Sequence, residues 1–324
     1  MNKMTLVQAI NLALKEEMAN NPDVVVMGED VGKDGGVFRA TIGLLEAFGE
    51  KRVIDTPLSE TGIIGTAIGM AAYGLIPVVE IQFLGFIYPA MEQIISHAAR
   101  LRSRTKGRYH CPLVIRAPYG GGIHAPEHHS ESAEALFVHI PGIKVVVPAT
   151  PSDARSLLKS AIRDPDPVLF LEPARIYRSI KEELTEDRLA PLGEARMAKT
   201  GKDITLIAWG SMLHVTLKAA EAVQKEGIDA EVIDLRTLYP MDTDKIMASI
   251  QKTGRGMIVH EAPLKGGLGG EIAAVIQEKG LLYLEAPILR VTGYNTSIPL
   301  PKLEQAYLPT PERIIEAIHQ TLRF

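Results

Sequence analysis

The pattern of apolar and polar positions predicts strands that alternate with helices along the whole chain. Short continuous apolar runs are typical of strands in a parallel sheet that is covered on both faces. In the first half such runs lie at residues 24–27, 53–55, 77–83, 112–116, 144–147 and 168–171. Helical periodicity occurs at residues 4–18, 88–104 and 152–162. This order predicts an α/β domain built on a doubly wound parallel sheet.

The second half repeats the alternation on a smaller scale. Strands are expected at residues 204–209, 230–235, 256–260 and 288–291, and helices at 213–225, 243–253, 270–279 and from Pro311 onward. The segment between the halves is charged and carries Pro191 and Gly193, as interdomain connections commonly do. The predicted organisation is therefore two doubly wound domains, residues 1–180 and 203–324, joined by a linker at 181–202.

The stretch at residues 62–79 carries no charge and is near the minimum length of a membrane span. Gly74 and Pro77 interrupt it, which favours a buried helix, a turn and a strand. Gly65 and Gly69 have the spacing that lets a second helix approach closely, as at a subunit interface.

Composition narrows the possible functions. The chain has 324 residues, of which 46% are hydrophobic and 23% charged, as in a globular protein with a substantial core. Its formal net charge of -4 argues against nucleic acid as a partner, because neutralising phosphates requires a basic surface. The single cysteine, Cys111, excludes a disulfide framework within the chain. Glu16 and Glu17 disfavour a secretory signal in the N-terminal amphipathic helix, so the expected location is the cytoplasm.

One carboxylate occupies a position of particular interest. Glu60 follows a short strand within the run Asp-Thr-Pro-Leu-Ser-Glu (residues 55–60) and precedes a glycine-punctuated apolar helix. Burial there would raise the pKa of a carboxyl group and let it share a proton with a ligand nitrogen. Ser59 or Thr61 as the N-cap, with Glu60 in the first helical turn, is an equally ordinary structural explanation.

Two other motifs invite a ligand. The turn at residues 266–270 is rich in glycine, but it lacks the spacing of the dinucleotide and P-loop fingerprints, so close backbone packing is favoured. His124, His128 and His129 resemble a metal-binding group, but Pro126 interrupts any helix that would align the first two. A zinc site is therefore disfavoured.

Several strings resemble the β subunits of the thiamine-dependent 2-oxo acid dehydrogenases. They are Val-Met-Gly-Glu-Asp-Val-Gly (26–32), Gly-Gly-Val-Phe-Arg (35–39), the run at 55–60, Glu-Ile-Gln-Phe (80–83) with Phe86, His-His-Ser-Glu-Ser (128–132), the runs at 141–148 and 160–167, and Asp-Leu-Arg-Thr (234–237). The match extends over essentially the whole chain in order. It implies a transketolase-like pyrimidine-binding domain, then a transketolase C-terminal domain, in an α2β2 heterotetramer.

The resemblance also implies a divided active site. Enzymes that hold thiamine diphosphate through Mg²⁺ usually carry Gly-Asp-Gly followed by paired asparagines, since that ion requires oxygen ligands. This chain has no Gly-Asp-Gly, and its only Asn-Asn pair is Asn20-Asn21. The α subunit is thus expected to hold Mg²⁺ and to supply the other half of the site.

The resemblance assigns roles to individual residues. The glutamate matching Glu60 hydrogen-bonds the aminopyrimidine ring of thiamine diphosphate, Phe86 packs on that ring, and Leu58 and Gln82 line the same pocket. His129 matches a general acid or electrostatic partner for an incoming lipoyl group. The positions that match a structural K⁺ site are Leu113, Ala161, Ile162, Asp164 and Asp166.

The implied reaction is oxidative decarboxylation of a 2-oxo acid, with transfer of the acyl group to a lipoyl group on an acyltransferase core that the C-terminal domain docks. Pyruvate is the expected substrate, because residues 120–127 resemble pyruvate-type subunits. The runs at 169–173, 260–264 and 284–287 resemble branched-chain ones. Acetoin cleavage, a sugar-phosphate activity of the split-transketolase type and a non-catalytic scaffold are the remaining alternatives.

Overall fold

The computed structural model describes residues 3–184 and 188–324, and the chain divides into two compact units. Unit 1 comprises Met1–Tyr119 and Leu136–Leu192, and unit 2 comprises Gly120–Ala135 and Gly193–Phe324. Part of the predicted linker, residues 185–187, lies outside the described residues. The helix α5 (Glu134–Val138) crosses the boundary between the two units.

Unit 1 is built on a parallel sheet, as the apolar runs predict. Its strands are β2 (Val24–Gly28), β3 (Val53–Asp55), β4 (Ile76–Glu80), β5 (Val114–Tyr119), β6 (Lys144–Val146) and β7 (Val168–Pro173). They lie side by side in the order β6-β7-β5-β4-β2-β3, and every pair is parallel. Parallel pairing brings the carboxyl ends of all six strands to one edge, where the loops that carry chemistry usually lie.

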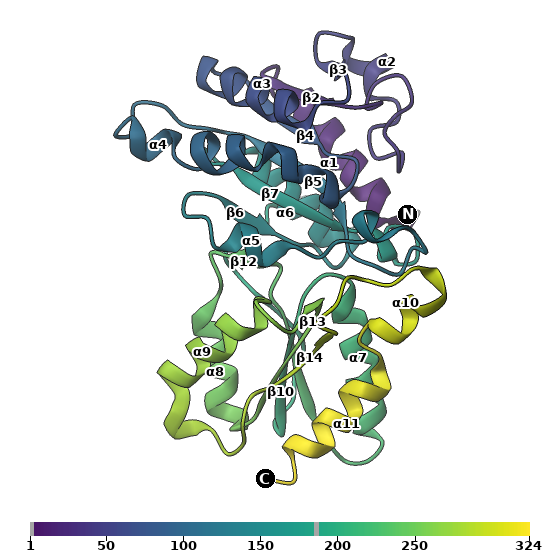
Figure 1. Cartoon of the computed structure of the whole chain (residues 1–324), viewed down its shortest axis with the longest axis vertical. Helices are drawn as coiled ribbons and strands as arrows, with labels where there is room; N and C mark the ends of the chain where they lie inside the picture. Colours follow the sequence, from purple (N-terminus) through teal and green to yellow (C-terminus); the bar gives the residue numbers. More distant parts are fainter. Residues whose placement is uncertain (1–2, 185–187) are drawn as a thin grey trace. The chain divides into compact units, whose positions relative to one another are not determined.

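Helices and short elements complete unit 1 (Figure 1). They are β1 (Met4–Thr5), α1 (Leu6–Asn20), α2 (Leu44–Phe48), α3 (Glu60–Tyr73), η1 (Leu84–Ala90), η2 (Gln93–Ala98), α4 (Leu101–Arg104), α6 (Pro151–Ile162), η4 (Ala174–Ile176) and β8 (Lys181–Glu182). Helix α1 packs against α6, whereas α3 packs against η1 and η2. Strand β1 pairs with β8 in a small antiparallel sheet.

The helix expected at residues 88–104 is divided into three pieces. Element η1 is a 3₁₀ helix that contains Pro89, η2 is a π-helix, and only α4 is a short α-helix. Proline lacks the N–H that an α-helix needs, and short 3₁₀ and π segments are common where the regular ladder is interrupted. The expected helical character is therefore confirmed over most of residues 88–104, but the helix is irregular in type.

Helix α3, the turn at Gly74 and β4 confirm the helix, turn and strand expected at residues 62–79. The helix buries only one face, through Ile63, Ile64, Ala67 and Ala71. Gly69 and Tyr73 lie on exposed surface, and Tyr73 is 90% exposed. Within the described residues no helix has the length and apolar character needed to cross a membrane.

Unit 2 contains a second, five-stranded sheet. Its strands are β9 (Arg196–Lys199), β10 (Ile204–Ala208), β11 (Ala230–Asp234), β13 (Gly256–Pro263) and β14 (Leu289–Gly293), in the order β14-β13-β10-β11-β9. All pairs are parallel except β11 with β9, so part of the predicted linker forms an antiparallel edge strand.

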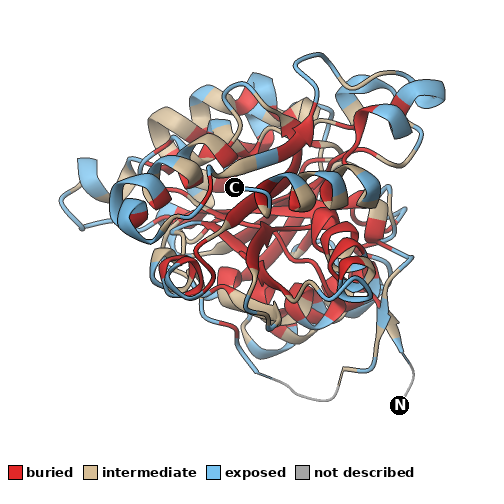
Figure 2. Ribbon diagram, turned by 90° about the horizontal axis from the view of Figure 1, so that it is seen from below, coloured by how far each residue is buried: buried red, intermediate tan, exposed pale blue. Residues whose placement is uncertain are grey.

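The helices of unit 2 cover both faces of this sheet. They are α7 (Ser211–Gln224), α8 (Thr243–Thr253), α9 (Gly269–Gly280), α10 (Pro301–Tyr307) and α11 (Pro311–Thr321), with the short elements η3 (Glu127–His129), β12 (Thr237–Tyr239) and η5 (Leu281–Tyr283). Helix α7 packs against α11, and α8 against α9, on opposite sides of the strands (Figure 1). Figure 2 shows the strands buried and the outward helix faces exposed.

Candidate functional site

The carboxyl edge of the unit 1 sheet gathers most of the residues expected to bind a cofactor. Gly28, the last residue of β2, lies in register with Asp55 of β3 on one side and Glu80 of β4 on the other. The segments that leave these three adjacent strands carry Glu29, Glu60 and Gln82. Residues that are up to 53 positions apart in the chain thus lie at one sheet edge.

Glu60 is the first residue of α3 and is half-buried. Ser59 is the N-cap of this helix, because its side chain accepts a hydrogen bond from the Gly62 N–H at 3.4 Å. The structural explanation for the run at residues 55–60 is therefore confirmed. It is compatible with a functional role, since a carboxylate in the first turn lies at the positive end of the helix dipole.

A second carboxyl group lies within electrostatic range of Glu60. Burial raises the pKa of Glu29, and the negative charges of Glu60 and Asp30 raise it further. Neighbouring carboxylates that disfavour each other's ionisation hold a proton more readily than isolated ones. The carboxyl group of Glu29 at this edge therefore holds its proton more tightly than an isolated carboxyl group does.

The remaining residues expected in the cofactor pocket are distributed around the same edge. Gln82 donates a hydrogen bond from Nε2 to Asp30 Oδ2 at 3.2 Å. The half-buried Phe86 lies in η1, and its ring contacts Phe83 edge-to-face at 5.7 Å between centroids. Leu58 precedes α3 and is 78% exposed, so unit 1 by itself does not enclose it.

The positions expected to bind K⁺ lie at the opposite edge of this sheet. Leu113 precedes β5, Ala161 and Ile162 end α6, and Asp164 and Asp166 precede β7. The Leu113 carbonyl accepts from the Val168 N–H at 2.9 Å and the Ala161 carbonyl from the Asp164 N–H at 3.3 Å.

Two cations already lie beside the acidic residues of this group. Lys144 Nζ is 2.7 Å from Asp164 Oδ1, and Arg102 Nε is 2.6 Å from Asp166 Oδ1. The five positions therefore lie at the end of α6 and the starts of β5 and β7, and their two carboxylates are already partly neutralised by Lys144 and Arg102.

The three histidines lie in unit 2, on the segment that we call the histidine loop (residues 120–130). His128 and His129 belong to η3, and their rings are 4.5 Å apart. Burial lowers the pKa of His129, the neighbouring His128 lowers it further, and Glu127 opposes both. Among the described residues no group of three or more His, Cys, Asp or Glu side chains is arranged to hold a metal ion.

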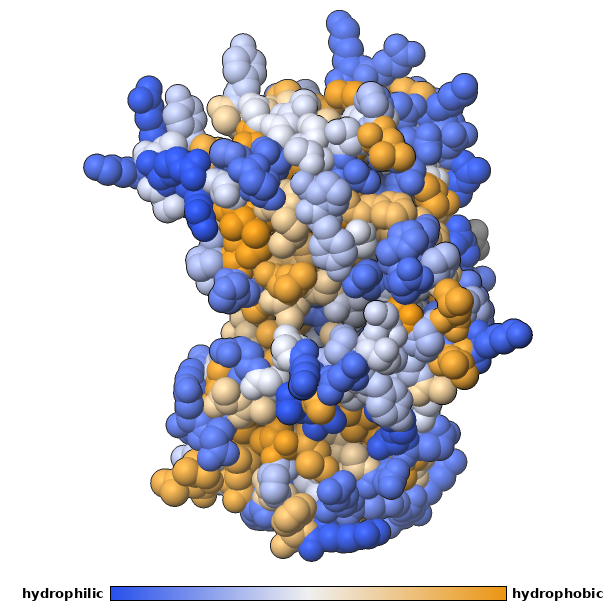
Figure 3. Space-filling view, viewed as in Figure 1, coloured by the Kyte–Doolittle hydropathy of each residue, from blue (hydrophilic) through white to orange (hydrophobic). Residues whose placement is uncertain are grey.

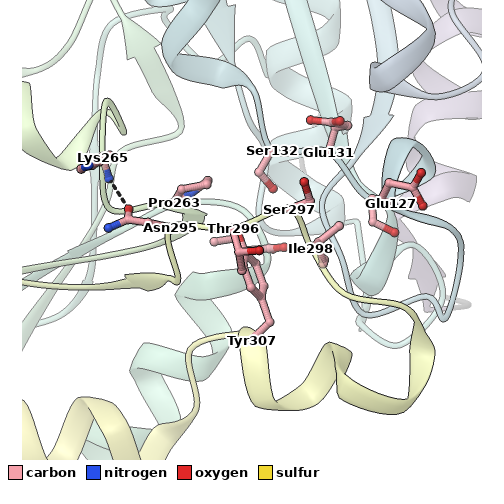
Figure 4. Close-up of a pocket in the computed structure, with 12 residues that line it drawn as sticks. Glu127, Glu131, Ser132, Pro263, Lys265, Asn295, Thr296, Ser297, Ile298 and Tyr307 are labelled. Carbon is pink, nitrogen blue, oxygen red and sulfur yellow. Dashed lines mark hydrogen bonds between the residues drawn. The ribbon is translucent and has the colours of Figure 1, made fainter.

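The histidine loop forms part of the wall of a cavity of about 410 Å³ in unit 2 (Figure 4). Glu127 and Ser130 contribute to it from the loop, Glu131 directly after the loop, and Glu261 and Tyr307 from the rest of unit 2. The sequence motifs assign no role to Glu261, nor to the neighbouring buried carboxylates Glu134 and Glu304. Each lies inside a run that reads as an ordinary strand or helix, so no local signal marks it.

The glycine-rich turn at residues 266–270 is explained by packing. A Cβ at Gly267 would lie 2.7 Å from His260 Cε1, and one at Gly269 would lie 2.7 Å from His260 Nε2. His260 is buried and stacks on Trp209 at 5.3 Å between centroids. The glycines therefore leave space for the buried imidazole, and the prediction of close packing at this turn is confirmed.

Comparison with known proteins identifies the two domains and the fold. Residues 2–179 match the family "Transketolase, pyrimidine binding domain", and residues 193–314 match "Transketolase, C-terminal domain". A solved structure, "Split gene transketolase, inactive beta4 tetramer", superposes with a TM-score of 0.81 at 25% identity and covers 99% of each chain. The fold is thus that of a two-domain transketolase-type protein.

Curated relatives define the family more narrowly. The pyruvate dehydrogenase E1 component subunit beta of Bacillus subtilis (strain 168) is 48% identical over 325 residues and covers 100% of both chains. The 2-oxoisovalerate dehydrogenase subunit beta of the same organism is also 48% identical, over 327 residues, with the same coverage. The chain belongs to the family of E1 β subunits of the 2-oxo acid dehydrogenases.

Glu134 allows a test of the electrostatics in unit 2. Burial raises the pKa of Glu134 from 4.5 to about 7, and the charge of Glu261 adds to the effect. The folded state therefore keeps a proton on Glu134 that the unfolded chain releases above pH 4.5. The folded state is most stable while both states are protonated, and it loses stability as the pH rises from 4.5 toward 7. A difference of this size corresponds to about 3 kcal/mol.

The Glu134→Gln variant has no carboxyl group to ionise at this position, so we expect its stability not to fall in this way. Its free energy of unfolding relative to that of wild type should therefore rise by about 3 kcal/mol between pH 4.5 and pH 8. The free energy of unfolding of unit 2 is measured by denaturant titration followed through the fluorescence of Trp209, the only tryptophan of the chain, which lies in this unit. Glu278→Gln, at an exposed position of α9, is the matched control. Equal pH profiles for Glu134→Gln and wild type would contradict the assignment.

Proposed function

We propose that this chain is the β subunit of a thiamine diphosphate-dependent 2-oxo acid dehydrogenase that acts on pyruvate and passes the acyl group to a lipoyl domain. The observation that carries the proposal is the full-length 48% identity to the E1 β subunit of a pyruvate dehydrogenase. Equal identity to a 2-oxoisovalerate dehydrogenase β subunit keeps branched-chain 2-oxo acids as the second candidate.

The residues at the carboxyl edge of unit 1 fit one half of thiamine diphosphate. The aminopyrimidine ring needs a carboxyl partner for a ring nitrogen and an apolar surface for its face. Glu60 is the carboxyl partner, and the raised pKa of Glu29 beside it supports a site that retains protons. Phe86 offers the aromatic surface, and Gln82 and Leu58 complete the pocket.

The diphosphate half of the cofactor requires a second chain. Mg²⁺ takes oxygen ligands in a strict octahedral arrangement. The sequence has no Gly-Asp-Gly, and the described residues contain no acidic group of three or more members suited to a metal. The α subunit, in an α2β2 heterotetramer, would supply the Mg²⁺ ligands.

Exposed apolar surface supports the need for partner chains. Tyr73 on α3 is 90% exposed and Leu282 after α9 is 96% exposed, with Leu281 and Tyr283 beside it. Apolar patches of this kind on single chains commonly mark protein interfaces. The apolar surface at the end of α9 is visible in Figure 3.

Glu60 would act on a proton. Thiamine diphosphate, when bound, supplies the nucleophilic carbon and the electron sink that decarboxylation of a 2-oxo acid requires. A carboxyl group at Glu60 that shares a proton with a pyrimidine nitrogen makes the amino group opposite basic enough to serve as the proton acceptor. An amide at this position cannot share a proton in that way.

His129 would serve the transfer of the acyl group. In that transfer the lipoyl disulfide is reduced, so that one sulfur takes the acyl group and the other takes a proton. A histidine whose pKa is lowered is a stronger acid than an ordinary imidazole, which favours proton donation from its protonated form. His128 would shape the loop around it.

A structural K⁺ would lie at the amino edge of the unit 1 sheet. Leu113, Ala161 and Ile162 would contribute carbonyl oxygens, and Asp164 and Asp166 would close the site. K⁺ there would hold the end of α6 against the starts of β5 and β7.

The pair of α and β chains with thiamine diphosphate and Mg²⁺ tests the proposed function. We expect reduction of an artificial electron acceptor with pyruvate, and weaker reduction with 3-methyl-2-oxobutanoate and 4-methyl-2-oxopentanoate. The β chain alone should be inactive. Preference for a branched acid would select the second candidate, whereas sugar-phosphate or acetoin activity alone would overturn the dehydrogenase assignment.

Substitution of Glu60 and His129 should separate two steps of this reaction. Glu60→Gln should lower both acceptor-dye reduction and lipoyl acylation by about 10²- to 10⁴-fold, because both depend on activation of the cofactor. His129→Ala should lower only the acylation, by about 10²-fold or more. Full activity of Glu60→Gln would indicate a scaffold, and an equal loss of both steps in His129→Ala would contradict its role.

K⁺ should stabilise the protein specifically. A ligand at a hundredfold excess over its Kd stabilises the folded state by about 2.7 kcal/mol. We expect a higher Tm in KCl than in NaCl or choline chloride at equal ionic strength, and a smaller difference for Asp166→Ala. Asp244→Ala, an exposed aspartate on α8, is the control. The same Tm in all three salts would refute the site.

A further inference from the structure

The histidine loop has a backbone that few sequences adopt. Gly120, Gly122 and His124 all have positive φ angles, of 84°, 89° and 58° respectively. For histidine this left-handed conformation is uncommon and persists only where surrounding contacts stabilise it. The contacts that hold this loop are therefore expected to be strong ones.

Glu304 supplies the first of these contacts. It lies in α10, is 1% exposed, and each of its carboxylate oxygens accepts from the loop. Oε1 accepts from the Gly122 N–H at 2.7 Å, and Oε2 accepts from the His124 N–H at 3.3 Å. The His124 imidazole Nδ1 is 3.2 Å from Oε2.

Glu261 supplies the second contact. It lies in β13, is 5% exposed, and accepts from the Gly121 N–H at 2.9 Å through Oε2. Its other oxygen accepts a hydrogen bond from the Ser211 hydroxyl at the start of α7. A Cβ at Gly120 would lie 2.9 Å from the same carboxylate, so the loop backbone packs directly on it.

These two carboxylates and the loop depend on each other. A buried carboxylate costs several kcal/mol unless hydrogen bonds compensate for the lost water. Three backbone N–H groups of the loop provide those bonds, and bonds to a charged acceptor are stronger than neutral ones. Removing either carboxylate would leave buried or part-buried N–H groups without their acceptor, so we expect the loop to move.

The held segment and His129 belong to the same short loop. The Gly120 N–H donates to the Glu131 carbonyl at 2.9 Å, which closes the base of the loop. The His129 N–H donates to the Pro126 carbonyl at 3.0 Å, and the Ser130 N–H donates to the Glu127 carbonyl at 2.9 Å. Because the segment is short and closed, we expect a shift at residues 121–124 to move the His129 imidazole as well.

We propose that Glu261 and Glu304 form a carboxylate clamp that positions His129 for proton donation in acyl transfer. The clamp lies wholly in unit 2, whereas Glu60 lies in unit 1. Both residues are positioning residues, since they contact the loop backbone and not the reacting groups. The inference rests on the proposed function of His129.

The test uses Glu304→Gln in the assembled α2β2 enzyme, because an amide keeps the size of the side chain but replaces one acceptor oxygen by a donor. The rate of acylation of an isolated lipoyl domain should fall by about 10- to 100-fold, because a misplacement of a reacting group by about 1 Å can cause a loss of this size. Dye-coupled decarboxylation should stay near the wild-type rate. Glu278→Gln, an exposed carboxylate of the same unit, should change neither.

A double-mutant cycle shows whether Glu304 acts through His129. In the His129→Ala background the Glu304→Gln change should slow acylation little further, because the group that it positions is gone. Hydrogen exchange should also be faster at the Gly122 and His124 amides of Glu304→Gln. Unchanged acylation, or losses that multiply in the double variant, would overturn the clamp.

The outcomes separate this inference from the proposed function. A wild-type enzyme without 2-oxo acid activity would overturn the function itself. An active wild type with a fully active Glu304→Gln would overturn only the clamp. If Glu304→Gln fails to assemble, Glu304→Asp keeps both acceptor oxygens on a side chain one methylene shorter, and should show the same selective loss in milder form. A proportional loss of both activities in Glu304→Asp would refute the positioning role.

Discussion

The arrangement of unit 1 depends on one buried ion cluster that joins three neighbouring strands. Arg116 of β5 is 1% exposed and donates two hydrogen bonds to Glu172 of β7, at 2.7 and 3.1 Å, and one to Glu80 of β4, at 3.0 Å. Tyr177 donates to Glu172 at 2.5 Å. Burial opposes the charge on Arg116, but Glu172 and Glu80 outweigh it and raise its pKa. Breaking such a group by removing one partner typically costs about 3–5 kcal/mol. The cluster therefore fixes the ends of β4, β5 and β7, and with them the segment that carries Gln82 and Phe86.

The sequence predicts the fold well because each strand of a covered parallel sheet reads as a continuous apolar run. The strands at residues 24–27 and 168–171 are found within β2 and β7. Prediction is less exact where local geometry departs from a regular period, as near Pro89, where short helical pieces of three types form instead of one regular α-helix. The apolar period of a helix does not distinguish α, 3₁₀ and π turns, so the pattern alone cannot predict which of these types forms.

Some residues of the candidate site can be predicted from the sequence, and others cannot. Glu60 stands out because its motif is local, and Ser59 caps the helix as its residue type suggests. The assignment of Phe86, Gln82 and His129 needed the resemblance to a family, since each reads locally as core or loop. Glu261 and Glu304 were missed, because their partners in the histidine loop lie 140 and 182 residues away. Long-range contacts between a carboxylate and backbone N–H groups leave no trace in composition, periodicity or spacing.

The two compact units divide the chemistry of the proposed enzyme. Glu60 would activate the cofactor from the carboxyl edge of unit 1, and His129 would serve the lipoyl group from a loop of unit 2. Each unit also contains a pair of buried carboxylates: Glu80 and Glu172 in the strands of unit 1, and Glu261 and Glu304 against the histidine loop of unit 2. The carboxylates of unit 1 are held by a buried arginine, whereas those of unit 2 are held mainly by N–H groups. Because the loop backbone hydrogen-bonds directly to Glu261 and Glu304, we expect changes in the clamp to alter acyl transfer without affecting decarboxylation.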